Sequence, residues 1–266
     1  MNDLRAITFD FGNTLVPFPP GSTDHVIVRT AERLAPLLRV DAAEFVRLWG
    51  EERSRQFATE VPLGLEADSE LRAARVIARL RGCPAPPSAV AWESSAALDY
   101  VEPGEVAAFV ETNAGFFVAA TPVPPGVEQM LARLAGRFRL GIVSNWPLAV
   151  AIERFVEAAG WSPHLAAVVV SQRVGAIKPL PAIFEATAAA LGVASGPQLL
   201  HVGDDVGADV VGAHGVGWLA ALVTQRLEGT PLPSAPPAPG VRADLEIATV
   251  LDIEAALGLH ERRVAP

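Results

Sequence analysis

The 266-residue chain is short of several features that other classes of protein need. Its single cysteine, Cys83, excludes an internal disulfide and a zinc site built from cysteines. Basic residues are outnumbered, 21 against 30 acidic ones, and the net charge of −9 disfavours nonspecific binding to nucleic acid or to a membrane surface. No apolar run reaches the length of a membrane span, and no signal-like segment opens the chain. We therefore expect a cytoplasmic protein with neither nucleic-acid nor membrane partner.

The first third of the chain reads as one short strand followed by helices. Residues 4–9 are apolar and β-rich, and a Pro-rich turn follows at 16–21. Apolar residues then recur at helical spacing over 22–39, 41–59, 66–81, 88–98 and 104–116. We predict an inserted α-helical cap domain over residues 17–118. The arginines at 53–55 and 72–81 alternate with acidic residues, which predicts solvated helix faces.

After residue 118 strands and helices alternate. Strand patterns at 137–143, 165–170, 198–202, 217–223 and 243–247 are separated mostly by helical ones. This alternation predicts a parallel sheet with right-handed crossovers. The fold class expected is α/β, a doubly wound Rossmann-like sheet, with a core domain of residues 1–16 and 119–266. The Pro- and Ala-rich stretch 229–240 predicts a surface loop.

Four polar clusters follow the predicted strands or lie in loops between them. They are Asp10-x-Gly12-x-Thr14, Ser144-Asn145, Lys178-Pro179, and Gly203-Asp204-Asp205 with Asp209. Because the carboxyl ends of parallel strands meet at one edge of a sheet, we expect these clusters to lie together. Each cluster alone is a weak signal, but their joint order and spacing predict a single site.

The residue types in these clusters suit phosphoryl transfer. An aspartate at a strand end, Asp10, can act as a covalent nucleophile or bind a hard cation. Asp10 and Asp204 can each give Mg²⁺ one carboxylate oxygen, and the Gly12 carbonyl can add another ligand. Lys178, the only lysine of the chain, supplies a cation that neutralises charge on the transferring group.

The remaining polar residues are predicted to contact the substrate. The Ser144 hydroxyl and the Asn145 amide can hold phosphate oxygens, and the turn residues Gly12 and Asn13 face the same edge.

These motifs resemble those of the haloacid dehalogenase (HAD) superfamily, most of whose members are phosphatases. The matching stretches are Asp-Phe-Gly-Asn-Thr-Leu at 10–15, Ile-Val-Ser-Asn at 142–145, Lys-Pro at 178–179 and residues 202–213. The resemblance covers nearly the whole chain, and the helical insertion falls where that family places a cap. It implies a catalytic Asp10, phosphate contacts from Ser144 and Lys178, and Asp204 as a metal ligand. Asp205 or Asp209 would be a further metal ligand or its partner.

One position departs from the family pattern. The phosphatases usually carry a second aspartate two residues after the nucleophile, as general acid and base, and Gly12 stands there. General acid–base help is worth about 10²- to 10⁴-fold in rate, so its loss predicts slow hydrolysis of alkyl phosphates. Aryl and acyl phosphates should suffer least. Another group, such as His25, could replace the acid, or Gly12 could be a plain turn residue.

The function predicted is a Mg²⁺-dependent hydrolase that removes phosphate from a small phosphorylated metabolite through an aspartyl-phosphate on Asp10. The alternatives are a haloacid dehalogenase, which also lacks the second aspartate and needs no metal, or a catalytically weakened binding or regulatory protein of the same fold. The acidic turn at 203–205 favours the metal-dependent enzyme, since carboxylates without a cation would repel one another.

Overall fold

One parallel sheet forms the centre of the computed structural model, which describes residues 3–92, 94–236 and 239–259. The described strands are β1 (Ala6–Phe9), β2 (Arg139–Ser144), β3 (Ala167–Val170), β4 (Leu199–Gly203), β5 (Leu219–Val223) and β6 (Leu245–Ile247). Their order across the sheet is β3-β2-β1-β4-β5-β6, and all neighbours are parallel. The predicted α/β doubly wound fold is confirmed.

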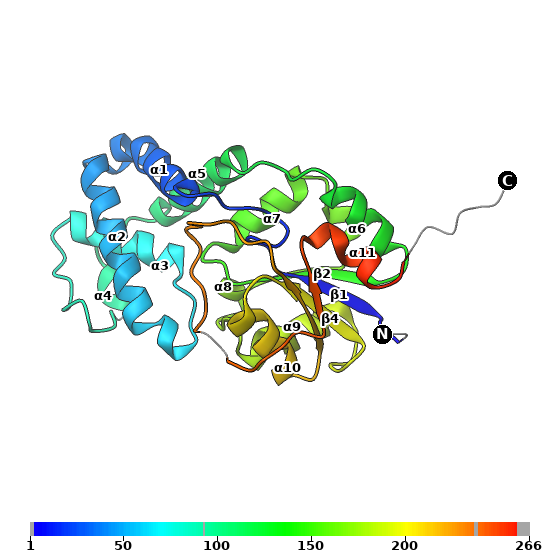
Figure 1. Ribbon diagram of the computed structural model, residues 1–266. Coiled ribbons are helices and arrows are strands. Elements are labelled where there is room, and N and C mark those ends of the chain that lie inside the picture. Colours follow the sequence, from blue (N-terminus) through cyan, green and yellow to red (C-terminus); the bar gives the residue numbers. More distant parts are fainter. Residues whose placement is uncertain (1–2, 93, 237–238, 260–266) are drawn as a thin grey trace.

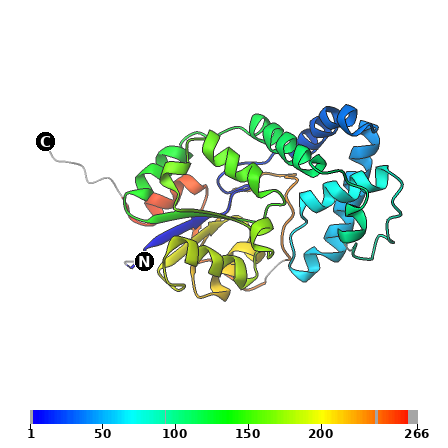
Figure 2. The ribbon, with the colours of Figure 1, turned by 180° about the vertical axis from the view of Figure 1, so that it is seen from behind.

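Helices cover both faces of this sheet (Figures 1 and 2). One face carries α6 (Val127–Ala135), α7 (Ala149–Ala158) and α11 (Ile253–Ala256), and the other carries α9 (Pro181–Leu191) and α10 (Val211–Gly215). Successive side chains of a strand point to opposite faces. Accordingly, Ile7 and Phe9 join the first layer and Ala6 joins the second.

A helical segment lies between β1 and β2 in the chain and to one side of the sheet in space (Figure 1). It consists of α1 (Ser22–Leu38), α2 (Ala42–Thr59), η1 (Val61–Leu63), α3 (Ser69–Leu80), α4 (Ser94–Leu98) and α5 (Glu105–Ala120). Its own apolar core includes Phe45, Trp49 and Phe109. The structure has α5 continuing two residues past the predicted boundary at 118. The division into a core and a cap domain stays a prediction.

Three local features differ from the expected elements. α3 begins at Ser69 rather than residue 66, because the Asp68 carboxylate accepts hydrogen bonds from the first free amides of that helix. The pattern at 88–98 forms helix only over α4. Two short helices were not expected, α8 (Ser171–Val174) and the π-helix η3 (Val206–Val210). The single-turn helices η2 (Ser162–His164) and η4 (Val250–Asp252) complete the described elements.

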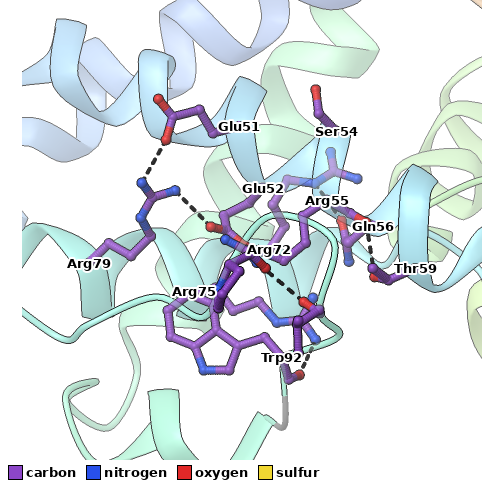
Figure 3. Close-up of polar contacts among 12 residues, drawn as sticks. Glu51, Glu52, Ser54, Arg55, Gln56, Thr59, Arg72, Arg75, Arg79 and Trp92 are labelled. Atoms are coloured by element: carbon purple, nitrogen blue, oxygen red, sulfur yellow. Dashed lines mark hydrogen bonds and ion pairs between the residues drawn. The ribbon is translucent and has the colours of Figure 1, made fainter.

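The prediction that the arginines of α2 and α3 lie on solvated faces is wrong for three of them. Arg55, Arg72 and Arg75 are only 6%, 3% and 3% exposed. Both helices are packed on more than one side within the segment, so the side opposite its apolar core is also covered. A polar network fills that space, in which Arg55, Arg75 and Arg79 pair with glutamates and Arg72 bonds Gln56 (Figure 3).

The helical segment contacts the sheet layer along two lines. α5 packs against α7, and the loop before α3 is bonded to loops that follow the strands. In this loop Gly64 accepts from the Ile177 amide at 3.0 Å, and the Ser69 amide donates to the Pro147 carbonyl at 2.9 Å. A cavity of about 730 Å³ lies between the segment and the sheet edge. Among the described helices, none has the length and apolar character needed to cross a bilayer.

Candidate active site

Strand register brings the four polar clusters to one edge of the sheet. Phe9, the last residue of β1, pairs with Ile142 of β2 and Val202 of β4. The Asp10 amide then donates to the Val202 carbonyl at 2.8 Å. The residues that follow these three strands therefore meet, as the sequence predicted.

The Lys178 ammonium lies at the centre of this meeting point. Its Nζ donates to Asp10 Oδ1 and Asp209 Oδ1, both at 2.6 Å, and to the Val143 carbonyl at 2.9 Å. These bonds use all three donors of the ammonium. Burial alone would lower the pKa of Lys178, but the charges of Asp10 and Asp209 outweigh it and raise the pKa. Lys178 is thus a permanent cation.

Asn145 fixes the lysine through its backbone. The Asn145 side chain accepts from the Lys178 amide at 2.7 Å and donates to the Lys178 carbonyl at 3.0 Å. The side chain of Asn145 is thus engaged with the backbone of Lys178, and the predicted contact of its amide with phosphate oxygens stays a prediction. Ser144, the last residue of β2, lies one position earlier and is 1% exposed.

Three carboxylates converge beside the lysine. Oxygens of Asp10, Asp204 and Asp209 lie within 4.8 Å of one another. Burial raises the pKa of Asp10 to about 6 despite the opposing charge of Lys178. Burial, reinforced by the charges of Asp10 and Asp209, raises the pKa of Asp204 to about 8. Such crowding of negative charge is relieved by a bound cation, so this group could hold a divalent metal ion.

Asp204 is the carboxylate of the three with a buried oxygen that accepts no hydrogen bond from the described residues. Its Oδ2 lies 3.1 Å from Arg226 Nε, but the alignment is not that of a hydrogen bond. Both atoms are buried, and neither has a hydrogen-bond partner among the described residues. A buried carboxylate oxygen left in this state suits a metal ligand.

Asp209 is held firmly by its neighbours. Its Oδ1 receives Lys178 and lies 3.0 Å from Nε2 of the fully buried His201, and its Oδ2 accepts from the Asp205 amide at 2.9 Å. Burial would raise the pKa of Asp209, but Lys178 and His201 outweigh it and hold the pKa below its usual range. Both oxygens are thus engaged, and the carboxylate orients the lysine. The predicted part of Asp209 in binding a metal stays a prediction.

Asp205, also predicted as a metal ligand, lies outside the three-carboxylate group. One of its oxygens accepts from the Ala208 amide and caps η3, and the other accepts from the Ala235 amide at 2.8 Å. The wider turn of the π-helix carries Asp209 back toward the lysine instead, a distortion that helices often show at functional sites. Gly203 is needed for this return, since a Cβ there would lie 2.1 Å from Asp209 Oδ2.

The turn after β1 meets an unexpected partner. Asn13 adopts a left-handed conformation, with φ of 57°, and its side chain bonds the Phe18 amide and the Thr230 hydroxyl. An added Cβ at Gly12 would lie 2.4 Å from Leu232 Cδ1. The side of the turn where a longer side chain would point is therefore filled by Leu232.

Thr230 and Leu232, which contact Asn13 and Gly12, belong to residues 225–236, which we call the strap. In Figure 1 it is the orange segment that passes between the helical segment and the sheet. The strap touches the site at Asn13, Gly12, Asp204 and Asp205. Residues 229–236 form a loop in which every residue is exposed or half-buried, as predicted for 229–240, but this loop also packs against the site; residues 237–238 lie outside the described chain.

The cavity begins beside this site. Asn145, Trp146 and Leu232 line it on the sheet side, whereas Asp10 does not reach its wall. His25, considered as a replacement acid, is an exposed residue of α1 outside the lining. The sequence offered no signal for Arg226 or Leu232 beyond the change of composition in this region.

Comparison with known proteins gives the class of this site. The family model of haloacid dehalogenase-like hydrolases matches residues 4–217. The chain belongs to this family of hydrolases, which act on small molecules. It is 31% identical over 143 residues to pyrimidine 5'-nucleotidase YjjG of Escherichia coli K12, a match that covers 52% of this chain. The match spans only 61% of that relative.

Solved structures share the fold over nearly the full length. A 2-haloacid dehalogenase from Pseudomonas syringae has a TM-score of 0.62 at 19% identity, covering 96% of this chain and 99% of its own. A HAD phosphatase from Thermococcus onnurineus has a TM-score of 0.58 at 20% identity, and the match covers 96% of this chain and 98% of that one. At this identity the likeness establishes the fold alone, and it includes both phosphatases and dehalogenases.

Proposed function

We propose that the protein is a Mg²⁺-dependent phosphatase of a small phosphorylated metabolite, with Asp10 as nucleophile. The observation that carries this proposal is the convergence of Asp10, Asp204 and Asp209 within 4.8 Å beside Lys178. Three carboxylates face two cations there, Lys178 and Arg226. A phosphate group would be repelled by the remaining negative charge unless a further cation joined it.

Asp10 and Asp204 are the residues best placed to hold Mg²⁺, with the Gly12 carbonyl as a further ligand, because both oxygens of Asp209 are already bonded. Bound there, Mg²⁺ would neutralise charge on the phosphoryl oxygens. Lys178 holds Asp10 Oδ1 and so presents the other oxygen, Oδ2, for attack.

The reaction proceeds in two displacements. Asp10 Oδ2 bonds to phosphorus, the ester P–O bond breaks, and the leaving oxygen takes a proton from solvent because position 12 offers no acid. Water then attacks the aspartyl-phosphate, which releases inorganic phosphate and restores the carboxylate. The absence of an acid at Gly12 makes activated leaving groups the better substrates.

A haloacid dehalogenase is the second candidate. Two observations favour it: Gly12 supplies no acid, which attack on carbon does not require, and Arg226 already offsets the charge of Asp204 without a metal. Chemistry of this kind would release halide and would not depend on Mg²⁺.

A panel of phosphoesters and 2-haloacids, assayed for phosphate and halide release with and without Mg²⁺, tests the proposal. Mg²⁺-dependent phosphate release that disappears in Asp10→Asn is the result expected. Asp41→Asn is the matched control, since asparagine also caps the remote helix α2 that Asp41 begins. Halide release indicates the dehalogenase, and binding without turnover indicates the non-enzymatic alternative.

A further inference from the structure

Arg72 on α3 is a buried cation without an acidic partner. Its Nε donates to the Gln56 side-chain oxygen and its Nη2 to the Ala67 carbonyl, both at 2.7 Å. The guanidinium lies 4.7 Å from the centroid of the Trp49 ring. Among the described residues no carboxylate lies within ion-pair distance of it, although the side chain is almost fully buried. Its direct partners are all neutral.

The other three arginines of the network differ in this respect (Figure 3). Arg55 pairs with Glu52 at 3.0 Å, Arg75 with Glu60 at 2.5 Å, and Arg79 with Glu52 at 2.7 Å. None of these three lines the cavity, and Arg72 does. A buried charge without a counter-ion is unfavourable, so the pattern indicates an anion that is supplied from the cavity.

A second arginine adds to the positive charge on this wall. Arg53 lines the same cavity, and its guanidinium packs over the Phe57 ring at 4.7 Å. Burial, together with the charge of Arg53, lowers the pKa of Arg72 to about 9, although the more distant carboxylates of Glu66, Asp68 and Glu60 oppose this shift.

The carboxylates whose charge acts on Arg72 are engaged elsewhere: Asp68 accepts from the first amides of α3, and Glu60 pairs with Arg75. Glu66 lines the cavity, but its carboxylate already accepts from the Ser171 hydroxyl and the Ala67 amide, and burial raises its pKa. Asp24 lies on the opposite helix, α1, where its side chain is exposed.

We propose that Arg72, assisted by Arg53, binds a second anionic group of the substrate, a carboxylate or a second phosphate. This inference rests on the proposed phosphatase function. The cavity of about 730 Å³ runs from these arginines to Asn145 and Trp146 beside the nucleophile, a size suited to a small metabolite. The planar guanidinium offers the paired donors that carboxylate and phosphate oxygens accept.

The test measures binding, by calorimetry with Mg²⁺ present, in the Asp10→Asn protein so that no turnover occurs. One matched pair of ligands is 3-phosphoglycerate and glycerol 3-phosphate, which differ by a carboxylate. The other is fructose 1,6-bisphosphate and fructose 6-phosphate, which differ by a phosphate. We expect the doubly anionic member of one pair to bind about 10- to 100-fold more tightly than its partner. The pair that shows this identifies the anion.

Substitution of the arginine must remove that preference. Added to Asp10→Asn, Arg72→Gln is expected to bring the ratio to about 1, and Arg72→Lys to restore part of it. Arg47→Gln, on the exposed face of α2, is the control that should leave the ratio unchanged. Should Arg72→Gln fail to fold, as judged by its thermal transition, Arg53→Gln at the cavity rim tests the same ratio.

Equal binding of both members in both pairs, or a preference that survives Arg72→Gln, overturns the subsite. Failure of the phosphatase proposal is a separate result, absence of phosphate release from the wild-type protein, and leaves the binding test in place.

Discussion

Leu232 packs where a side chain at position 12 would begin, so it should limit the effect of restoring a general acid there with Gly12→Asp. A side chain added at position 12 would place its Cβ 2.4 Å from Leu232 Cδ1, whereas ordinary contacts begin near 3.4 Å. Leu232 must therefore withdraw by about 1 Å, and because the crowded atom is the end of a flexible, half-buried side chain, the cost should be at most about 1 kcal/mol, the low end for overpacking. A general acid contributes about 10²- to 10⁴-fold in rate. Gly12→Asp alone should thus recover only part of that gain.

Combining Gly12→Asp with Leu232→Ala should give the rest of this gain in rate, because the smaller alanine leaves room for the aspartate. We expect the double variant to hydrolyse glycerol 3-phosphate about 10²- to 10⁴-fold faster than wild type, with a coupling between the two changes of up to about 1 kcal/mol. On p-nitrophenyl phosphate, whose leaving group needs little protonation, the gain should be small. The assay is phosphate release at saturating Mg²⁺, reported as kcat/KM for the wild type, both single variants and the double variant.

Gly12→Asn combined with Leu232→Ala is the control, because asparagine has the shape of the acid but cannot donate a carboxyl proton. Equal rates for Gly12→Asp with and without Leu232→Ala would show that Leu232 does not obstruct this position. No gain in a folded, Mg²⁺-binding double variant would show that the acid is not what the site lacks.

Three further predictions concern charge. Arg226→Gln should tighten Mg²⁺ binding measured by calorimetry, because it removes a competing cation from Asp204; weaker binding would contradict this. Glu66→Gln should gain thermal stability relative to wild type as the pH rises above 4.5, and a constant difference would refute it. The reason is that burial raises the folded-state pKa of Glu66, so its contribution is full below 4.5 and is lost as the pH rises through that raised pKa. Arg75→Met should lower the free energy of unfolding in urea by about 3–5 kcal/mol, because Glu60 is left buried and unpaired; an unchanged midpoint would be inconsistent with this.

The sheet and the central cluster could be predicted from the sequence because both follow from local patterns. Alternating strands and helices dictate a parallel sheet, and a parallel sheet brings Asp10, Lys178 and Asp204 to one edge whatever the intervening chain does. The choice between Asp205 and Asp209 could not be predicted, since it depends on the π-helical turn and on the Ala235 amide.

The features that escaped prediction depend on contacts between distant residues. Leu232 meets Gly12 across most of the chain, and a Pro-rich stretch carries no periodicity that would show what it covers. The burial of the arginines could not be predicted because charged residues on an amphipathic helix are usually solvated, and only the packing of α2 against α3 encloses them.

The chain has one lysine, and its lysine and arginines occupy positions of different geometry around the site and the cavity. The single lysine, Lys178, stands where a compact cation must reach three acceptors from different loops and strands, Asp10, Asp209 and the Val143 carbonyl. A planar guanidinium is larger and presents its donors in one plane, so arginine could not make these three bonds in the same space. At the cavity wall, where we propose that an anionic group of the substrate is recognised from one side, the chain has Arg53 and Arg72. The two kinds of cation thus suit different geometries: Lys178 bonds the proposed nucleophile Asp10, and Arg53 and Arg72 face the cavity in which we propose that the substrate binds.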